Sequence, residues 1–483
     1  MRRLILIFVF ASILVFANSI ILYSQPVTWF RTWGIPNRVE DGKRIVQTFD
    51  GGYAVLNIVS YGGGNDYFCL LKYNYLGNFL WSKIIIDTSS RMLIDMQQTS
   101  DSGFIFAGYT SGALLVKTDK NGNLKWLRNY ANLNPETRFY SVKQTKDNGY
   151  IACGDFTDYA NPSNKAILIK VDSLGYTQWE KQYIDSLFTG YGDVIQGIDR
   201  KFYVTGSTGN GYPSVSYALV KKIDSLGNVI WMNIFYANGG GQDITQLRDG
   251  SLVVGGKGSI STNRPILAKF DTSGNTKWVR YYYPTPYLWY YYMTKDLYDN
   301  LIITGLYQKG GYNETIGIWK LDTSGNIIKT KELSFSGYSS IYSSCIKPTS
   351  DSGFIISGNV FFSSINSGDA LIIKTDSAFN TPIITGIKNI NHQISNEFKV
   401  NHNFPNPFNS TTLIKFSLPN NGYVNINICD ILGKDVYSKN EFRIKGFNDI
   451  KFDFYELNLS SGIYFIRINF ETQSKLIKAI FLK

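Results

Sequence analysis

The sequence predicts an all-β protein, because strand and turn residues are abundant, helix-favouring runs are few, and one pattern repeats seven times. The 483 residues include 34 Tyr, 31 Phe and 44 Gly, and aromatic residues favour strands. Hydrophobic residues make up 44% of the chain and charged residues 18%, which is typical of globular rather than disordered proteins. The chain is longer than one ordinary domain, so we expect two or more folded units.

Residues 1–24 are predicted to be a signal peptide. Two arginines precede residues 4–15, which are apolar except for one serine, and small or polar residues follow up to Ser24. We expect cleavage after Ser24, with cleavage after Ser19 as the alternative. The competing interpretation is an uncleaved membrane anchor, since residues 4–23 are long enough to span a bilayer.

The middle of the chain repeats one unit of about 50 residues seven times. In every unit an apolar strand ends in a lysine, and the seven lysines are Lys72, Lys117, Lys170, Lys222, Lys269, Lys320 and Lys374. Asp or Asn follows two residues later, Gly comes three residues after that in six units, and Trp four residues further on in five. This spacing predicts a hairpin, because Asp bonds the turn backbone and Gly adopts positive φ.

Each unit also carries an earlier hairpin, whose best-preserved copies begin at Asp50, Asp101, Asp147 and Asp351. Four short strands per unit, repeated seven times, predict a seven-bladed β-propeller over residues 25–382. The units resemble the SBBP and quinoprotein-like repeats of secreted bacterial propellers. That resemblance implies a fold rather than an activity.

The seventh unit lacks a fourth strand, since no Trp follows Asp376 at the expected spacing. The missing strand is predicted at the other end of the chain, where residues 28–33 carry the Trp and the basic residue of a fourth strand. We expect this segment to pair with the strand around residues 370–374 and to close the ring, which leaves only short, protected sheet edges.

A different pattern occupies residues 400–483. Its marker residues are Asn403, Pro405, Asn406, Pro407, Phe408, Gly433, Lys434, Gly462 and Tyr464. In order and spacing they resemble the type A sorting domain of the type IX secretion system of the Bacteroidetes and related phyla. The resemblance implies transport of the folded protein across the outer membrane, with the secretion machinery and a sortase-like peptidase as partners. The mature protein would then be attached to the cell surface or released.

The residues themselves agree with this resemblance. Residues 412–416, 424–429 and 464–470 alternate apolar and polar side chains, as half-buried strands do. They predict an immunoglobulin-like antiparallel β-sandwich. Residues 383–399, which are polar with scattered apolar positions, are expected to be a linker.

Few groups in the predicted propeller favour catalysis. Both histidines, His392 and His402, lie outside it, which removes Ser-His-Asp or Cys-His catalysis and His-ligated metals. We predict no catalytic residue, no metal and no cofactor. The four Cys sit singly and are expected to be buried thiols. The net charge of +11 is spread along the chain, so no nucleic-acid partner is expected.

Alignment of the first strands places one residue from each unit near a mouth of the channel: Arg44, Asp95, Ser141, Asp193, Asp243, Tyr292 and Cys345. Three carboxylates there could bind a cation or act as acid and base. The alternative is that they hydrogen-bond loop amides and channel water. Residues 281–292, rich in Tyr, are expected to form an exposed loop on this face. The candidate ligand-binding residues are Arg44, Asp95, Asp193, Asp243, Trp289 and Tyr290.

These observations favour an exported, monomeric propeller that binds a glycan or a surface protein, or has a structural role, without catalysis. Export would use the Sec pathway and then the type IX system. The rival hypothesis is an extracellular hydrolase or lyase that acts on polysaccharide through the channel-mouth carboxylates, since carboxylates alone can cleave glycosides.

Overall fold

The computed structural model describes residues 27–35, 38–60, 66–86, 92–130, 136–158, 163–210, 216–236, 239–258, 264–283, 287–308, 314–335, 338–361, 368–382, 397–403, 405–420, 422–443 and 446–482. The predicted signal peptide and most of the predicted linker lie outside these ranges. Among the described residues, no helix is long and apolar enough to cross a membrane.

In the described part of the chain, strands β1 to β28 form seven four-stranded antiparallel blades, which fits the seven sequence repeats. Blade 1 contains β2 (Val39–Gln47), β3 (Tyr53–Ser60), β4 (Tyr67–Tyr73) and β5 (Phe79–Ile86). Blade 2 contains β6 (Met92–Gln98), β7 (Phe104–Thr110), β8 (Gly112–Thr118) and β9 (Leu124–Asn129). Blade 3 contains β10 (Thr137–Gln144), β11 (Tyr150–Asp158), β12 (Ser163–Val171) and β13 (Thr177–Tyr183). Blade 4 contains β14 (Phe188–Gln196), β15 (Phe202–Gly209), β16 (Ser216–Ile223) and β17 (Val229–Tyr236).

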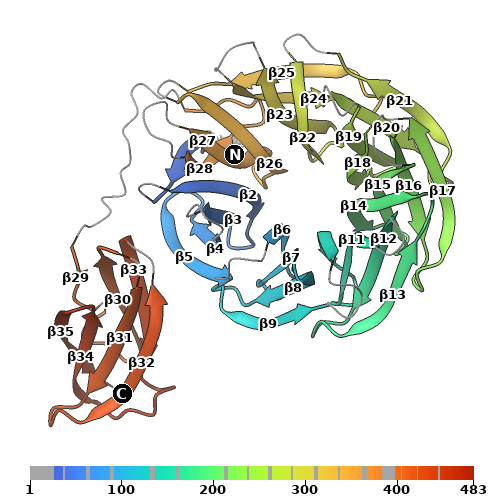
Figure 1. Cartoon of the computed structure of the whole chain (residues 1–483). Coiled ribbons are helices and arrows are strands. Elements are labelled where there is room, and N and C mark those ends of the chain that lie inside the picture. Colours follow the sequence, from blue (N-terminus) through green and yellow to red (C-terminus); the bar gives the residue numbers. More distant parts are fainter. Residues whose placement is uncertain are drawn as a thin grey trace, which may run out of the picture.

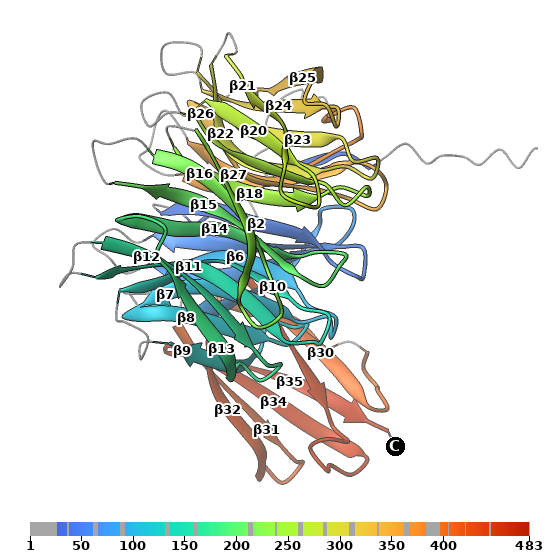
Figure 2. The same ribbon diagram turned by 90° about the vertical axis from the view of Figure 1, so that its right-hand side faces the viewer.

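The remaining blades follow the same order. Blade 5 contains β18 (Gly241–Gln246), β19 (Leu252–Lys257), β20 (Pro265–Phe270) and β21 (Thr276–Tyr281). Blade 6 contains β22 (Tyr287–Lys295), β23 (Leu301–Gln308), β24 (Thr315–Leu321) and β25 (Ile327–Leu333). Blade 7 contains β26 (Ser340–Pro348), β27 (Phe354–Phe361), β28 (Gly368–Thr375) and β1 (Trp29–Trp33). Figure 1 shows the blades arranged in a ring, with the first strands innermost, and Figure 2 shows the ring edge-on.

Blade 7 is assembled from the two ends of the propeller sequence. Strand β1 pairs antiparallel with β28, with Trp29 opposite Lys374 and Trp33 opposite Ala370. Both tryptophans are buried. The strand that is first in the chain therefore stands as the fourth strand of the last blade.

In four of the blades the repeated tryptophan of the fourth strand contacts the second hairpin of the next blade. Trp29 Nε1 donates a hydrogen bond to the Tyr75 carbonyl at 3.2 Å, and so links blade 7 to blade 1. The same bond joins Trp126 to Ser173, Trp179 to Ser225 and Trp231 to Thr272. The Trp motif is therefore a contact between blades.

The repeated glycine of the second hairpin is needed for two reasons. Gly77 has φ +74°, and a Cβ added there would lie 2.4 Å from the Trp29 ring. Gly175 has φ +82°, and its Cβ would lie 2.9 Å from Trp126. Glycine thus permits both the left-handed backbone and the close approach of the neighbouring blade.

The repeated lysine and the repeated aspartate of the first hairpin form one ion pair. Lys117 Nζ lies 3.0 Å from Asp101 Oδ1, and Lys374 Nζ lies 3.0 Å from Asp351 Oδ1. Both lysines are almost fully buried, so the carboxylate supplies the partner that a buried ammonium requires.

A glutamine at the end of the first strand was not recognised in the sequence. Gln98 Oε1 accepts a hydrogen bond from the Phe49 amide of the preceding blade at 2.9 Å, and Gln144 accepts one from Ser100 at 2.8 Å. Gln47, Gln196 and Gln246 make the same bond. The sequence signal that could have revealed this role is the recurrence of glutamine directly before the first hairpin.

The hydrophobic core lies between neighbouring blades rather than inside any one of them. For example, Leu56 of blade 1 shares a buried cluster with Met96 and Phe106 of blade 2. The four cysteines are buried and free.

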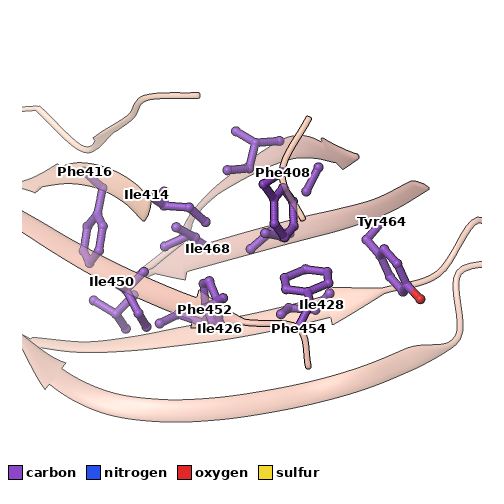
Figure 3. Close-up of a cluster of buried hydrophobic side chains, with 14 of the residues drawn as sticks. Phe408, Ile414, Phe416, Ile426, Ile428, Ile450, Phe452, Phe454, Tyr464 and Ile468 are labelled. Carbon is purple, nitrogen blue, oxygen red and sulfur yellow. The ribbon is translucent and has the colours of Figure 1, made fainter. Parts of the chain in front are cut away.

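The C-terminal domain is a sandwich of two antiparallel sheets. One sheet has the order β29 (Lys399–Val400), β30 (Thr411–Leu418) and β33 (Gly446–Asp453). The other has the order β32 (Asp435–Arg443), β31 (Gly422–Cys429), β34 (Gly462–Phe470) and β35 (Gln473–Phe481). Their inward side chains form one core, in which Ile414 and Phe452 of the first sheet meet Ile426 and Ile468 of the second (Figure 3).

Candidate functional site

Each innermost strand contains a β-bulge directly before the residue that the sequence places at the channel. In blade 1 the register shifts between Gly42 and Arg44, and in blade 2 between Leu93 and Asp95. The same shift precedes Ser141, Asp193, Asp243, Tyr292 and Cys345. A bulge sets two residues opposite one and re-aims the side chain that follows, so these seven positions are structurally equivalent.

Asp95 contacts a backbone amide and two cationic side chains. Its Oδ2 accepts hydrogen bonds from the Val142 amide at 3.1 Å and from Lys143 Nζ at 2.7 Å, both in blade 3. Arg44 Nε of blade 1 lies 3.4 Å from its Oδ1. Burial alone would raise the pKa of Asp95, but the charges of Lys143 and Arg44 hold it well below its usual range. Asp95 is therefore an ionised link between three blades.

The other two ring carboxylates make the same kind of link. Asp193 Oδ2 accepts the Ile244 amide of blade 5 at 3.2 Å, and Asp243 Oδ2 accepts the Met293 amide of blade 6 at 3.0 Å. In each case the amide follows the ring position of the next blade.

Asp243 differs from Asp95 in the direction of its pKa shift. Burial, together with the charge of Asp193, raises the pKa of Asp243 to about 7, although a hydrogen bond from Tyr290 opposes the shift. Asp95 has cationic partners in direct contact, whereas the closest partner of Asp243 is a phenol.

Arg44 is held in the same network. Its guanidinium lies 5.5 Å from the centre of the Tyr292 ring and also contacts Asp95. Arg44, Asp95, Asp193 and Asp243 thus occupy equivalent positions of the innermost strands. The three carboxylates accept hydrogen bonds from strand amides of the next blade, not from the loop amides of the stated alternative.

The expectation of an exposed aromatic loop is wrong for Tyr290. Trp289 and Tyr290 belong to strand β22, and Tyr290 is 0% exposed within a buried cluster that also holds Met293. Trp289 is half-buried. The run looked like a loop because of Pro284 and Pro286, but the first strand of blade 6 begins directly after them.

A cavity of about 460 Å³ opens at this ring. Most of its lining comes from blades 3, 4 and 5, and Arg44, Ile94 and Tyr292 add contacts from blades 1, 2 and 6. Blade 3 contributes Tyr140 and Asp155, blade 4 contributes Ser207, and blade 5 contributes Gln242 and Lys257. Glycines of blades 4 and 5 form much of its wall, namely Gly190, Gly192, Gly206, Gly239, Gly240 and Gly241.

The strand register explains why the cavity lies at these blades. Two positions before the bulge residue, blades 4 and 5 have Gly190 and Gly240, paired with Ser207 and Lys257. The equivalent positions in the other blades carry side chains: Asp41, Met92, Arg138, Trp289 and Tyr342. Missing side chains in two adjacent blades leave the space.

The polar groups of the cavity are not all paired. Tyr140 donates its hydroxyl to Asp155 Oδ1 at 3.2 Å, and burial raises the pKa of Asp155. Lys257 is half-buried, and among the described residues its ammonium has no hydrogen-bond or ion-pair partner. Burial lowers the pKa of Lys257. Sequence reasoning missed Asp155 and Lys257, which only alignment of the second strands could have suggested.

The C-terminal marker residues hold the leading segment of that domain on its last strand. Asn406 donates to the Lys478 carbonyl at 2.8 Å and accepts from the Ile480 amide at 2.9 Å, and the adjoining Pro407 follows a cis peptide bond. Buried Phe408 stacks on Phe481.

The remaining markers shape turns. Asn403 is buried and donates to Thr412 at 2.9 Å and to the Pro405 carbonyl at 3.4 Å. Gly433, at φ +80°, and Lys434 complete the exposed turn before β32. Gly462 begins β34, whose Tyr464 donates to the Ser460 carbonyl at 2.7 Å. The markers are thus fold-specifying residues.

Comparison with protein families matches residues 402–483 to the family described as "Secretion system C-terminal sorting domain". The C-terminal domain is a sorting domain. A type IX sorting domain implies export, so the protein is a secreted or surface-located cargo with a propeller fold. None of the curated proteins compared with the chain matches it.

Solved structures with a similar fold are distant in sequence. The extracellular domain of a proposed hybrid two-component system from B. thetaiotaomicron has 11% identity and a TM-score of 0.42, covering 94% of this chain and 57% of its own. This chain therefore spans less than two thirds of that structure. The Neurospora crassa Pan2 WD40 domain has 11% identity and a TM-score of 0.46, covering 72% and 96%. The β-propeller domain of the Trilobed protease from Pyrococcus furiosus has 10% identity and a TM-score of 0.41, covering 75% and 99%.

Proposed function

We propose that the propeller is a non-catalytic binding module, exported by the Sec and type IX systems, that binds a polar ligand of the carbohydrate class at the channel mouth. The observation that carries this proposal is that the ring carboxylates link neighbouring blades, while further polar groups line a cavity. Asp95 and Asp193 are bonded to backbone amides of the next blade and do not line the cavity. Asp243 makes the same kind of bond and does line it, together with Arg44 and with polar groups outside the ring of channel residues, such as Asp155, Ser207 and Lys257. A cavity of this size lies within the range of about 300–1,000 Å³ of small-molecule sites.

Export depends on the sorting domain in this proposal. The secretion machinery of the outer membrane would recognise the domain, and a sortase-like peptidase would remove it. Deletion of residues 400–483 should leave the propeller in the periplasm, as measured by fractionation and surface proteolysis of the producing cell. The control is a deletion of linker residues 385–394, which keeps the sorting domain and should leave export intact. Normal surface display of the first truncation would contradict the proposal.

Ligand binding is tested separately with the mature protein on an array of neutral and acidic glycans, combined with hydrolysis and elimination assays on the same sugars. Binding without turnover is the expected result. Absence of binding to every glycan would contradict the proposed function.

The hydrolase or lyase alternative has one observation in its favour. Asp155 and Asp243 line the same cavity, and burial raises the pKa of both carboxyls, as in sites where one acid and one base are needed. Turnover that is lost in both Asp155→Asn and Asp243→Asn would establish this alternative and overturn the non-catalytic role.

A further inference from the structure

We propose that the cavity of blades 3 to 5 binds an acidic saccharide, whose carboxylate pairs with Lys257 and whose hydroxyls bond Asp155, Tyr140 and Ser207. This inference rests on the proposed binding function and names its ligand class.

The first argument is the unpartnered ammonium of Lys257. Other buried lysines of the propeller, such as Lys117 and Lys374, each contact an aspartate at 3.0 Å. Lys221, which is also buried, contacts Asp185 at 2.6 Å. Lys257 is half-buried in the cavity wall and has no such partner among the described residues. Partial burial of the Lys257 ammonium without an anionic partner is unfavourable, so an anionic ligand that pairs with it would be stabilised.

The second argument is the placement of polar groups by strand register. Asp155, Ser207 and Lys257 occupy the same position in the second strands of three consecutive blades, and all three line the cavity. The equivalent residues of the other blades, Ile58, Tyr109, Leu306 and Asn359, do not line it. One acid, one hydroxyl and one ammonium therefore face a shared space, which suits a ligand with several hydroxyls and one charge.

The third argument concerns the wall between these groups. Gly190 and Gly240 bring backbone rather than side chains to the cavity, and glycine backbone permits close approach of a sugar ring. Tyr140 and Gln242 add donors and acceptors at the rim. This composition is polar on most sides, as a sugar requires.

The kind of anion follows from which cations are free. The guanidinium of Arg44, although it lines the cavity, is already paired with Asp95 and stacked on Tyr292. Among the described lining residues, the Lys257 ammonium is then the one cation available, and no guanidinium is free to form two parallel hydrogen bonds. This arrangement suits a carboxylate better than a phosphate.

Titration calorimetry of the full mature chain tests the inference. The acidic probes are trigalacturonate, trimannuronate and a glucuronate-containing hyaluronan tetrasaccharide, and galactotriose is the neutral probe. At least one acidic probe should bind about tenfold or more tightly than galactotriose, the gain expected for one charge-assisted hydrogen bond. Lys257→Met should remove this preference, whereas Lys120→Met, in an exposed turn of blade 2, should keep it.

A second variant tests the location. The backbone of Gly190 is not left-handed, and a Cβ there would lie 3.2 Å from Asp155 Oδ2. Gly190→Met, which introduces the residue that blade 2 has at this position, should fill the cavity and abolish binding of acidic probes while the circular dichroism spectrum stays unchanged.

The outcomes separate the two proposals. Tight binding of galactotriose with no acidic preference, or an unchanged preference in Lys257→Met, would overturn the inference but leave a binding propeller. Failure of all four saccharides and of the glycan array would overturn both.

Discussion

At the outer rim of the propeller four blades dock on the next through the same tryptophan, whereas at the channel mouth equivalent positions carry different residues in different blades. At the rim, Trp29, Trp126, Trp179 and Trp231 all donate to the following hairpin. At the mouth, the position that Gly190 and Gly240 occupy in blades 4 and 5 carries a charged, apolar or aromatic residue in the other blades. Repetition thus marks what the fold needs, and departure from it marks the candidate site.

Glycine illustrates this difference. Gly77 serves the fold, since its positive φ and its contact with Trp29 exclude a side chain. Gly190 has no positive φ, an added Cβ would lie 3.2 Å from Asp155, and its absent side chain opens the cavity. Gly240 also has no positive φ, but a Cβ there would lie 2.8 Å from Ser207. Glycine therefore permits the docking of neighbouring blades at the rim, whereas at the mouth it leaves space for the cavity.

The largest test of this contrast removes the closing strand. Deletion of residues 25–34 should lower the melting temperature by about 10 °C or more, because two buried tryptophans and one side of β28 lose their partners. Deletion of residues 25–27 alone is the control and should have little effect. Equal melting of the two truncations in calorimetry would show that β1 does not stabilise the ring.

A smaller effect is expected inside the ring. Tyr290→Ala should reduce the free energy of unfolding by about 3–5 kcal/mol, as for other core aromatics, because Tyr290 is fully buried. Tyr290→Phe, which removes only the bond to Asp243, should cost about 1–3 kcal/mol. Denaturant titration measures both values. Wild-type stability of Tyr290→Ala would restore the prediction of an exposed loop.

The pH dependence of stability tests Asp243 itself. Its pKa in the folded protein is about 7, above the value of about 4 in an unfolded chain, so folding favours the protonated carboxyl. That contribution is complete below about pH 4 and is lost as pH rises through 7. Asp243→Asn, which mimics the protonated form, should therefore gain stability relative to wild type between pH 4 and 8, on the order of 4 kcal/mol. A constant difference across this range, measured by urea titration at each pH, would contradict the assignment.

The smallest expected effect compares two hairpin glycines. Gly51 has φ +79° with nothing within 4 Å of an added Cβ, whereas Gly77 has φ +74° and faces Trp29 at 2.4 Å. Gly51→Ala should cost about 1 kcal/mol for the left-handed backbone, and Gly77→Ala about 1–2 kcal/mol more for overpacking. Equal losses in thermal unfolding would mean that docking at the rim tolerates an extra methyl group.

The sequence by itself determined the β class, the repeat unit, the hairpins and the sorting domain. These features depend on residues close together in the chain, such as Asp119 and Gly122 of one turn, whose chemistry dictates the local backbone. The closing strand was also predictable, because residues 28–33 copy a pattern present elsewhere in the chain.

The roles of the ring residues were decided by tertiary structure alone. Whether Asp95 is a free carboxylate or a link between blades depends on Val142 and Lys143 of another blade, and sequence alignment does not supply such contacts. The burial of Tyr290 depends on the bulge that follows it, which shifts the alternation of sides within β22. The cavity, likewise, depends on the packing of adjacent blades, which sets Gly190 of blade 4 beside Asp155 of blade 3 and Gly240 of blade 5 beside Ser207 of blade 4. Sequence encodes local geometry, but the meeting of residues from separate blades is created by the packing of those blades.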